Sequence, residues 1–174
     1  MARPLIVPAL AVLVGLVLGH APWLAAQPAP PLRGSQRGEA EPHARALSTQ
    51  DYIDIQQLYA RYYTAIDSGK GEAWADTFVA DGVFNELKGR AALVNLVNDY
   101  YKNGGGANRR HWHTNLVITP TAEGATGNVY LMQVDVKARP PVIYSHSHYD
   151  DVLVKTPRGW LFKSRIRGAS TLNN

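Results

Sequence analysis

Apolar residues in the first half of the chain recur every three or four positions, which is the spacing of one face of a helix. The pattern is clearest before Asp67, where the apolar series is Ile55, Leu58, Tyr59, Tyr62 and Ile66. Ser48 or Thr49 can cap this helix, and Asp51 follows in the first turn, where the helix dipole favours a negative charge. We therefore predict a first helix from residue 48 or 49 to about residue 67.

Two shorter helices are predicted after the first. One covers residues 72–79, where two aromatic residues are four positions apart, and the other covers residues 90–102, which end just before a run of three glycines. Between these helices, residues 80–82 predict a turn and residues 83–87 a strand.

After the glycines the hydrophobic period changes from about 3.6 residues to 2, which is the spacing of strands. Four strands are predicted, at residues 110–119, 125–136, 142–155 and 160–167. Short turns containing Gly and Pro separate them, so neighbouring strands should pair antiparallel. Helices followed by strands indicate an α+β fold. We expect three N-terminal helices on one face of a curved, mixed or antiparallel sheet, with a conical pocket between the two layers.

The N-terminal part differs from this domain. Residues 1–26 combine Arg3, an apolar run and a small-residue end, which is the layout of a secretory signal peptide. An uncleaved membrane anchor is the alternative, because the whole stretch approaches the ~20 residues that span a bilayer. Residues 27–47 are rich in Pro, Gly and Ala and predict a linker. The folded domain is then residues 48–174, exported to the periplasm or secreted, with or without the anchor.

Composition removes several classes of function. The chain of 174 residues has a net charge of +4 without dense basic runs, which argues against a nucleic-acid binder. It contains 0 cysteines, which excludes disulfides, thiolate metal sites and cysteine nucleophiles. Any chemistry must therefore come from His, carboxylate, Tyr, Lys, Arg or hydroxyl side chains.

The segments YYTAIDSGKGEAWADTF, ADGVF, RHWHTNLVI and SHYDDVLVKTPRGWLFKSR occur in this order. Together they resemble the SnoaL-like branch of the nuclear transport factor 2-like superfamily, over roughly residues 48–167. The resemblance implies a cone-shaped α+β fold with an internal hydrophobic pocket, often in a homo-oligomer, either a dimer or a trimer. Because the uses of this fold are diverse, membership alone implies no activity.

Within that superfamily the residues are most similar to the cofactor-independent lyases: scytalone dehydratase, hexachlorocyclohexane dehydrochlorinase and bile acid 7α-dehydratase. The resemblance implies a catalytic Asp–His pair at Asp67 and His111 and no cofactor. By similarity to the bile acid dehydratase, Tyr62, Asp135 and Arg165 are the further catalytic candidates. The residues that we expect to line the substrate site are Tyr63, Tyr149, Asn115 and Ser147.

These residue types suit the elimination of water next to an acidic C–H. His111 can take a proton near neutral pH, Asp67 can stabilise the imidazolium, and a tyrosine can donate to an oxygen of the substrate. Helix geometry places Tyr63 on the same face as Asp67, whereas the resemblance favours Tyr62. The structural alternatives are that Asp67 caps a turn, that both tyrosines are core residues, and that Arg165 forms an ion pair or lies on a solvated face.

Two His-x-His pairs support a weaker hypothesis. His111 with His113, and His146 with His148, lie on predicted strands, so both members of each pair should face one side. Such pairs could bind zinc or another divalent metal. The main prediction is a dehydratase without metal, acting on a small hydrophobic oxygenated ring compound such as a steroid, terpenoid or polyketide. A double-bond isomerase and a non-catalytic protein that binds a small ligand are also compatible with these residues.

Overall fold

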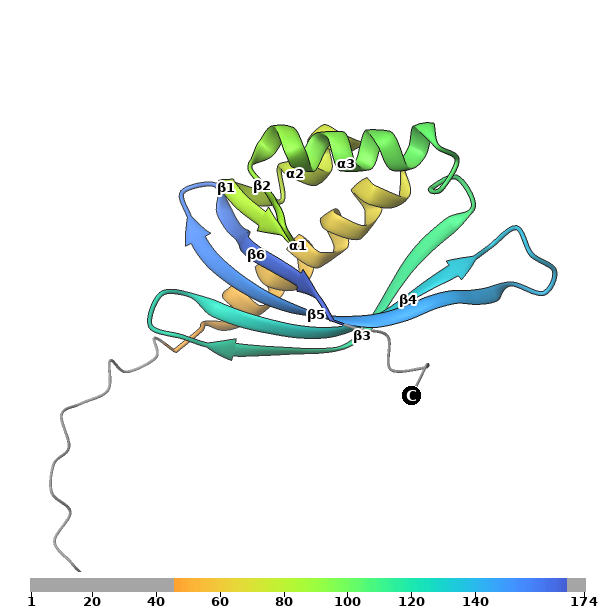
Figure 1. Cartoon of the computed structure of the whole chain (residues 1–174). Coiled ribbons are helices and arrows are strands. Elements are labelled where there is room, and N and C mark those ends of the chain that lie inside the picture. The colour runs from red at the N-terminus through yellow and green to blue at the C-terminus, as the bar shows by residue number, and fades with distance from the viewer. Residues whose placement is uncertain (1–45, 169–174) are drawn as a thin grey trace, which may run out of the picture. The chain divides into compact units, whose positions relative to one another are not determined.

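The computed structural model describes residues 46–168, which form helices on one face of a curved six-stranded sheet (Figure 1). The helices are α1 (Thr49–Asp67), α2 (Gly71–Ala75) and α3 (Arg90–Lys102). The strands are β1 (Phe78–Phe84), β2 (Leu87–Lys88), β3 (Arg109–Pro120), β4 (Ala125–Asp135), β5 (Val142–Thr156) and β6 (Gly159–Arg167). Their order in the sheet is β2-β1-β6-β5-β4-β3, and the sheet is not closed into a barrel.

The α+β prediction is confirmed, as are the first and third helices and the four C-terminal strands. Strands β3 to β6 pair antiparallel as expected, whereas β1 pairs parallel with β6. The expected signal peptide or anchor at residues 1–26 and nearly all of the expected linker lie outside the described residues. None of the helices within residues 46–168 is long and apolar enough to cross a membrane.

The predicted second helix was wrong in its extent. It ends at Ala75, and the segment from Phe78 to Phe84 is strand β1, which includes the predicted turn at residues 80–82 as an irregularity in its pairing with β6. The hydroxyl of Thr77 donates to the carbonyl oxygen of Trp74 at 2.6 Å, where the helix stops. Trp74 and Phe78 do pack together, with ring centroids 5.2 Å apart, but from two different elements. Their spacing of four residues therefore matches a helix period, although the two residues do not belong to one helix.

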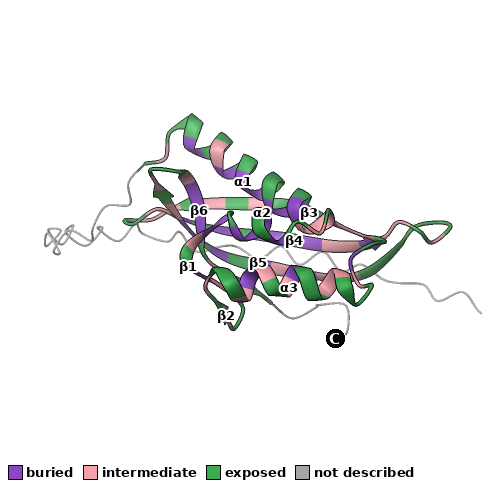
Figure 2. Ribbon diagram, turned by 90° about the horizontal axis from the view of Figure 1, so that it is seen from above, coloured by how far each residue is buried: buried purple, intermediate pink, exposed green. Residues whose placement is uncertain are grey.

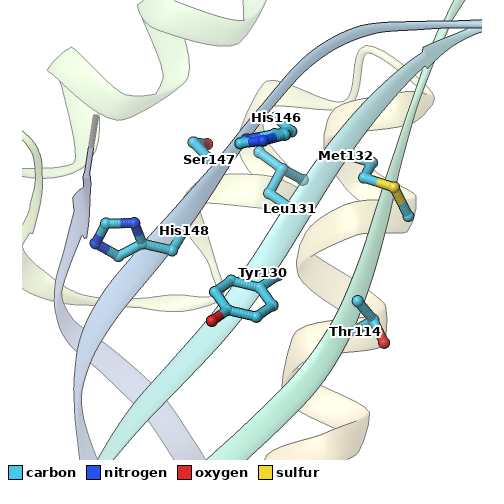
Figure 3. Close-up of a pocket in the computed structure, with 7 residues that line it drawn as sticks. All are labelled: Thr114, Tyr130, Leu131, Met132, His146, Ser147 and His148. Carbon is cyan, nitrogen blue, oxygen red and sulfur yellow. The ribbon is translucent and has the colours of Figure 1, made fainter. Parts of the chain in front are cut away.

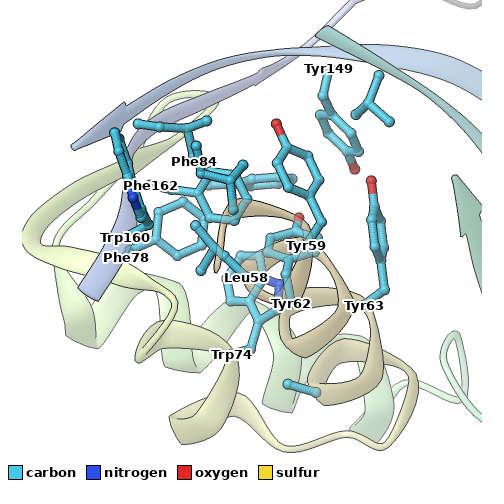
Figure 4. Packing of buried hydrophobic residues seen from close by; sticks show 14 of the residues in the cluster. Leu58, Tyr59, Tyr62, Tyr63, Trp74, Phe78, Phe84, Tyr149, Trp160 and Phe162 are labelled. Carbon is cyan, nitrogen blue, oxygen red and sulfur yellow. The ribbon is translucent and has the colours of Figure 1, made fainter. Parts of the chain in front are cut away.

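Helix α1 lies across the sheet and supplies three buried tyrosines to the core (Figure 4). Tyr59 and Tyr62 are fully buried, and both rings pack edge-on against Phe162 of β6, at 5.2 and 5.5 Å. Buried residues lie along one side of α1 and at alternate positions of β4 and β5 (Figure 2).

The opposite face of the sheet carries exposed apolar side chains. They include Trp112, Val117, Tyr130, Val152 and Ile166, each at least 40% exposed. The expected dimer or trimer would cover such a face, and this oligomeric state stays a prediction.

A buried ion pair crosses the core below α1. Arg165 of β6 is fully buried, and its Nε lies 3.1 Å from Oδ1 of Asp151 on β5. The hydroxyl of Tyr59 donates to the other carboxylate oxygen of Asp151 at 2.5 Å. Burial raises the pKa of Asp151 to about 6 against the opposing effect of Arg165, so the carboxyl group is ionised at neutral pH. The core therefore contains two charges that depend on each other.

The N-terminus of α1 is fixed by Asp51. Ser48 and Asp51 form a capping box, in which each side chain accepts a hydrogen bond from the backbone of the other residue. The same carboxylate accepts from Nζ of Lys155 at 2.7 Å and from Nε1 of Trp160 at 2.9 Å. These hydrogen bonds hold the pKa of Asp51 well below its usual value, and the bond from Lys155 has the larger effect, ahead of that from Trp160. One carboxylate thus ties the start of the helix to β5 and β6.

Replacing Asp51 should make the stability of the protein depend less on pH in the acid range. Because the pKa of Asp51 is lowered by folding, its contribution is fully present above its ordinary value of 3.8 and is lost as the pH falls below that value. We expect Asp51→Asn to lower the melting temperature at pH 7, and the difference from wild type to shrink at pH 3. Thermal unfolding followed by circular dichroism at both pH values measures this. An equal difference at both pH values would contradict the role of the charge.

Removing one partner of the buried ion pair should cost more than removing both. In Asp151→Leu the fully buried Arg165 charge loses its counterion, and such a change costs about 3–5 kcal/mol of unfolding free energy. The double variant Asp151→Leu/Arg165→Met removes the unpaired charge, so it should be more stable than Asp151→Leu alone. Urea unfolding of both variants measures the difference, and a double variant less stable than the single one contradicts the pairing.

Candidate functional site

Asp67 and His111 meet where the end of α1 contacts β3. Asp67 is the last residue of α1, and His111 is the third residue of β3. Nδ1 of the His111 ring lies 2.6 Å from Oδ1 of Asp67. The backbone N–H of His111 also donates to the carboxylate, at 3.2 Å to Oδ1 and 3.1 Å to Oδ2. The two side chains are only 4% and 16% exposed, for His111 and Asp67 respectively, so this pair is shielded from bulk water.

Gln133 of β4 contacts the other nitrogen of the His111 ring. The two residues are direct partners in the antiparallel β3–β4 pair, and Nε2 of Gln133 lies 2.8 Å from Nε2 of His111. Sequence reasoning missed Gln133. The pairing register would have identified it, but the register of β3 and β4 shifts between Thr114 and Val117, and no sequence signal locates that shift.

Asp135, which we expected near the pair, lies two positions further along β4. Its Oδ1 accepts hydrogen bonds from the backbone N–H groups of Lys137 at 2.9 Å and Ala138 at 3.2 Å. The carboxylate therefore shapes the turn after β4, and Gln133 occupies the position opposite His111. Counting along the sequence could not decide between these two neighbours on the same face of a strand.

Tyr63 of α1 stacks against both histidines at the start of β3. Its ring stacks on His113 at 4.6 Å and lies 6.3 Å from the ring of His111, with interplanar angles of 14° and 26°. Because α1 includes Asp67, Tyr63 and Asp67 lie on one helix face, as helix geometry predicts. Tyr62 instead packs among Trp74, Phe78 and Phe162 in the core.

Arg165 reaches the site through Tyr63. Its Nη2 donates to the Tyr63 hydroxyl at 3.1 Å, and its guanidinium lies 4.2 Å from the ring centroids of both Tyr62 and Tyr149. Burial acts to lower the pKa of Arg165, but Tyr63 and Asp151 outweigh it and raise the pKa, so the group stays charged. Burial raises the pKa of Tyr63 despite Arg165, so its hydroxyl keeps its proton.

The remaining expected residues lie at different places on the sheet. Tyr149 is buried on the helix side of β5, and Figure 4 shows its hydroxyl and that of Tyr63 pointing toward one another. Ser147 is buried on the same strand face, where its Oγ accepts from Nε of Arg167 at 2.9 Å. Asn115 is exposed, has a positive φ of 55° and lies at the pairing irregularity of β3, apart from the Asp67–His111 pair.

Two further tyrosines, which the sequence did not single out, end helix α3. The hydroxyl oxygens of Tyr100 and Tyr101 are buried and have no hydrogen-bond partner among the described residues. Burial raises the pKa of each, and the nearby charge of Asp67 raises it further. Both hydroxyls are therefore protonated donors in the neighbourhood of Asp67.

The two His-x-His pairs do not form one metal site. His111 and His113 face the helices from β3, where Tyr63 packs against them. His146 and His148 of β5 are direct partners of Met132 and Tyr130 and line a hollow on the outer face of the sheet (Figure 3). Within residues 46–168, no group of three or more His, Cys, Asp or Glu residues could hold a metal ion. Strand alternation places both members of each pair on one face. The register of β3, β4 and β5 places the two pairs on opposite faces of the sheet.

The chain matches the SnoaL-like domain family over residues 48–166. Among solved structures it is similar to a protein of unknown function from Mycobacterium tuberculosis, with 27% identity, a TM-score of 0.64 and coverage of 71% of this chain and 74% of that chain. A protein from Catenulispora acidiphila in complex with S-DNPA is 29% identical, with a TM-score of 0.58 and coverage of 69% and 95%.

A third similar structure shows the fold alone. It is an NTF2-like protein with a cystatin-like fold from Novosphingobium aromaticivorans, 24% identical, with a TM-score of 0.65 and coverage of 72% of this chain and 84% of that chain. No match is found among curated proteins. The predicted resemblance is confirmed: the chain belongs to the SnoaL-like domain family, and it has the fold of an NTF2-like protein.

Proposed function

We propose that this protein is a cofactor-independent lyase that removes water from a small hydrophobic, oxygenated ring compound. The observation that carries the proposal is the contact of 2.6 Å between Oδ1 of Asp67 and Nδ1 of His111. A carboxylate in this position fixes the histidine tautomer and stabilises the imidazolium that forms when the histidine accepts a proton. The pair is thus suited to general acid–base catalysis.

In the proposed reaction, Nε2 of His111 removes a proton from a carbon next to a carbonyl group of the substrate. The electron pair of the C–H bond forms a C=C bond, and the C–O bond to the neighbouring hydroxyl group breaks. The departing hydroxide takes the proton back from the His111 imidazolium and leaves as water. The enzyme then returns to its starting state without any co-reactant.

Tyr63 is the proposed hydrogen-bond donor to the substrate. Its oxygen already accepts from Arg165 at 3.1 Å, so its own proton is free to point elsewhere. The charge of Arg165 also makes this hydroxyl a stronger donor to an oxygen that becomes negative in the transition state. Arg165 itself contacts Tyr63 and the core, so we assign it a positioning role in place of the catalytic role that the resemblance implied.

The substrate class rests on the surroundings of the pair and on the family. The groups around His111 are largely aromatic, with Tyr63 stacked beside it and Tyr149 facing the same layer. Such rings bind flat apolar molecules well. A relative with 29% identity was solved in complex with S-DNPA, which supports small-molecule binding by proteins of this kind.

A double-bond isomerase would use the same base and the same donor, but would return the proton to another carbon. A protein that only binds its ligand would need neither proton transfer nor the Asp67–His111 contact. Turnover separates the binding protein from both enzymes, and the product separates the two enzymes from each other.

The test is turnover by point variants of the pair. Purified residues 46–174 and the variants Asp67→Asn and His111→Ala are incubated with a panel of hydroxylated ring ketones, and loss of water is followed by mass spectrometry. We expect kcat to fall about 10²–10⁴-fold in each variant, the usual contribution of a general acid–base group. Tyr63→Phe should give a smaller loss of kcat with little change in KM.

Matched controls carry the same substitutions away from the pair. Asp81→Asn changes an exposed residue of β1, and His146→Ala changes a residue on the outer face of the sheet. Both should keep wild-type turnover. Ligand binding with no turnover by wild type, at an affinity that the pair variants leave unchanged, would support the binding protein and reject the lyase.

A further inference from the structure

The hydrogen bonds around His111 continue beyond Gln133 onto two further strands, β5 and β6. Oγ of Ser145 on β5 lies 2.8 Å from Oε1 of Gln133. Nη2 of Arg167 on β6 lies 3.3 Å from the same Ser145 oxygen, while Nε of Arg167 is held by Ser147 at 2.9 Å. An unbroken chain of contacts therefore runs from Arg167 through Ser145, Gln133 and His111 to Asp67.

The chemistry at the two ends of this series of contacts determines which atom donates and which accepts in each hydrogen bond. A guanidinium group can only donate hydrogen bonds, so the Ser145 oxygen accepts from Arg167 and gives its own proton to Oε1 of Gln133. The amide then turns its NH₂ group toward Nε2 of His111. At the other end, a carboxylate can only accept, so Nδ1 of His111 carries a proton. Because the amide NH₂ group donates to Nε2, that nitrogen has the lone pair. Both ends lead to the same arrangement.

We propose that Gln133 is a positioning residue that holds His111 as a neutral imidazole with its lone pair on Nε2, and that Ser145 and Arg167 hold the amide of Gln133 in the orientation this requires. This is the form in which a histidine acts as a base, so the inference rests on the proposed function and deepens it. It also assigns a task to Arg167, whose side chain reaches both Ser145 and Ser147.

The other groups that face His111 cannot replace Gln133 in this task. Asp67 and Tyr63 of α1 lie against Nδ1 and against the ring face, and His113 lies beyond Tyr63. Tyr100 and Tyr101 of α3 are close enough to Asp67 for its charge to raise their pKa values, but neither hydroxyl has a partner among the described residues. Only Gln133 contacts Nε2 within residues 46–168.

The proposal implies that the amide and the substrate compete for the same nitrogen. A neutral imidazole has one lone pair in the plane of its ring, and Gln133 Nε2 lies 2.8 Å from that nitrogen. A substrate C–H must therefore displace the amide before its proton can move. The hydrogen bond that prepares the base also covers it until the substrate arrives.

The variant Gln133→Glu tests the inference without any substrate. Glutamate has nearly the same shape, but a carboxylate accepts where the amide donated, so it should hold a proton on Nε2 and make His111 doubly protonated. Long-range proton–nitrogen NMR at pH 8 distinguishes the forms, and His111→Gln identifies the signals of this ring among the 6 histidines. In wild type we expect a neutral ring with its proton on Nδ1, and in Gln133→Glu an imidazolium.

The matched control is Gln57→Glu, the same change on the exposed face of α1, which should leave the His111 signals unchanged. If Gln133→Glu does not fold, Gln133→Met replaces it. Loss of the donor should then move the Nε2 signal toward that of an unbound lone pair, while Gln57→Met leaves it in place. A His111 ring with wild-type signals in the folded Gln133 variant would overturn the inference. Because no turnover is measured, this result is independent of whether the protein is a lyase.

Discussion

A positive charge buried in the core sets the main constraint on this fold. The guanidinium group of Arg165 is fully enclosed, with one carboxylate at ion-pair distance and several aromatic rings around it. A charge in such a place is tolerated only when its surroundings compensate for the lost hydration. The surroundings come from α1, β5 and β6 together, so these three elements can pack in few other ways. The position of α1 on the sheet follows from this requirement.

The site depends on that position. Asp51 fixes the start of α1 to β5 and β6, the tyrosines in the middle of the helix surround Arg165, and Asp67 at its end holds β3. The helix thus connects the middle of the sheet to its edge. A shift of α1 by one residue would turn Asp67 by about 100° around the helix axis and separate it from His111. Stability of the core and alignment of the Asp67–His111 pair are consequences of one packing arrangement.

Much of this could be predicted from the sequence, because helix and strand periods are local signals. Helix α1, helix α3 and strands β3 to β6 follow from these periods, and the position of Tyr63 relative to Asp67 follows from helix geometry. The first strand was predicted to begin at residue 83 instead of at Phe78, because Phe78 packs on Trp74 across a break between elements. The resemblance named Asp135 and not Gln133, which is the partner of His111 across β3 and β4, and the register of these strands depends on an irregularity that leaves no pattern in the sequence. Helices and strands could therefore be predicted from the sequence, whereas the pairing of residues between strands could not.

Asp67 holds His111 by two groups at once, the N–H of the backbone and the N–H of the ring. The carboxylate therefore binds His111 at two points, and the imidazole cannot rotate about its side-chain bonds without breaking one of these hydrogen bonds. Nε2 of His111 is therefore fixed relative to the backbone of β3. In the proposed reaction, little of the free energy of reaching the transition state would then be spent on arresting side-chain motion.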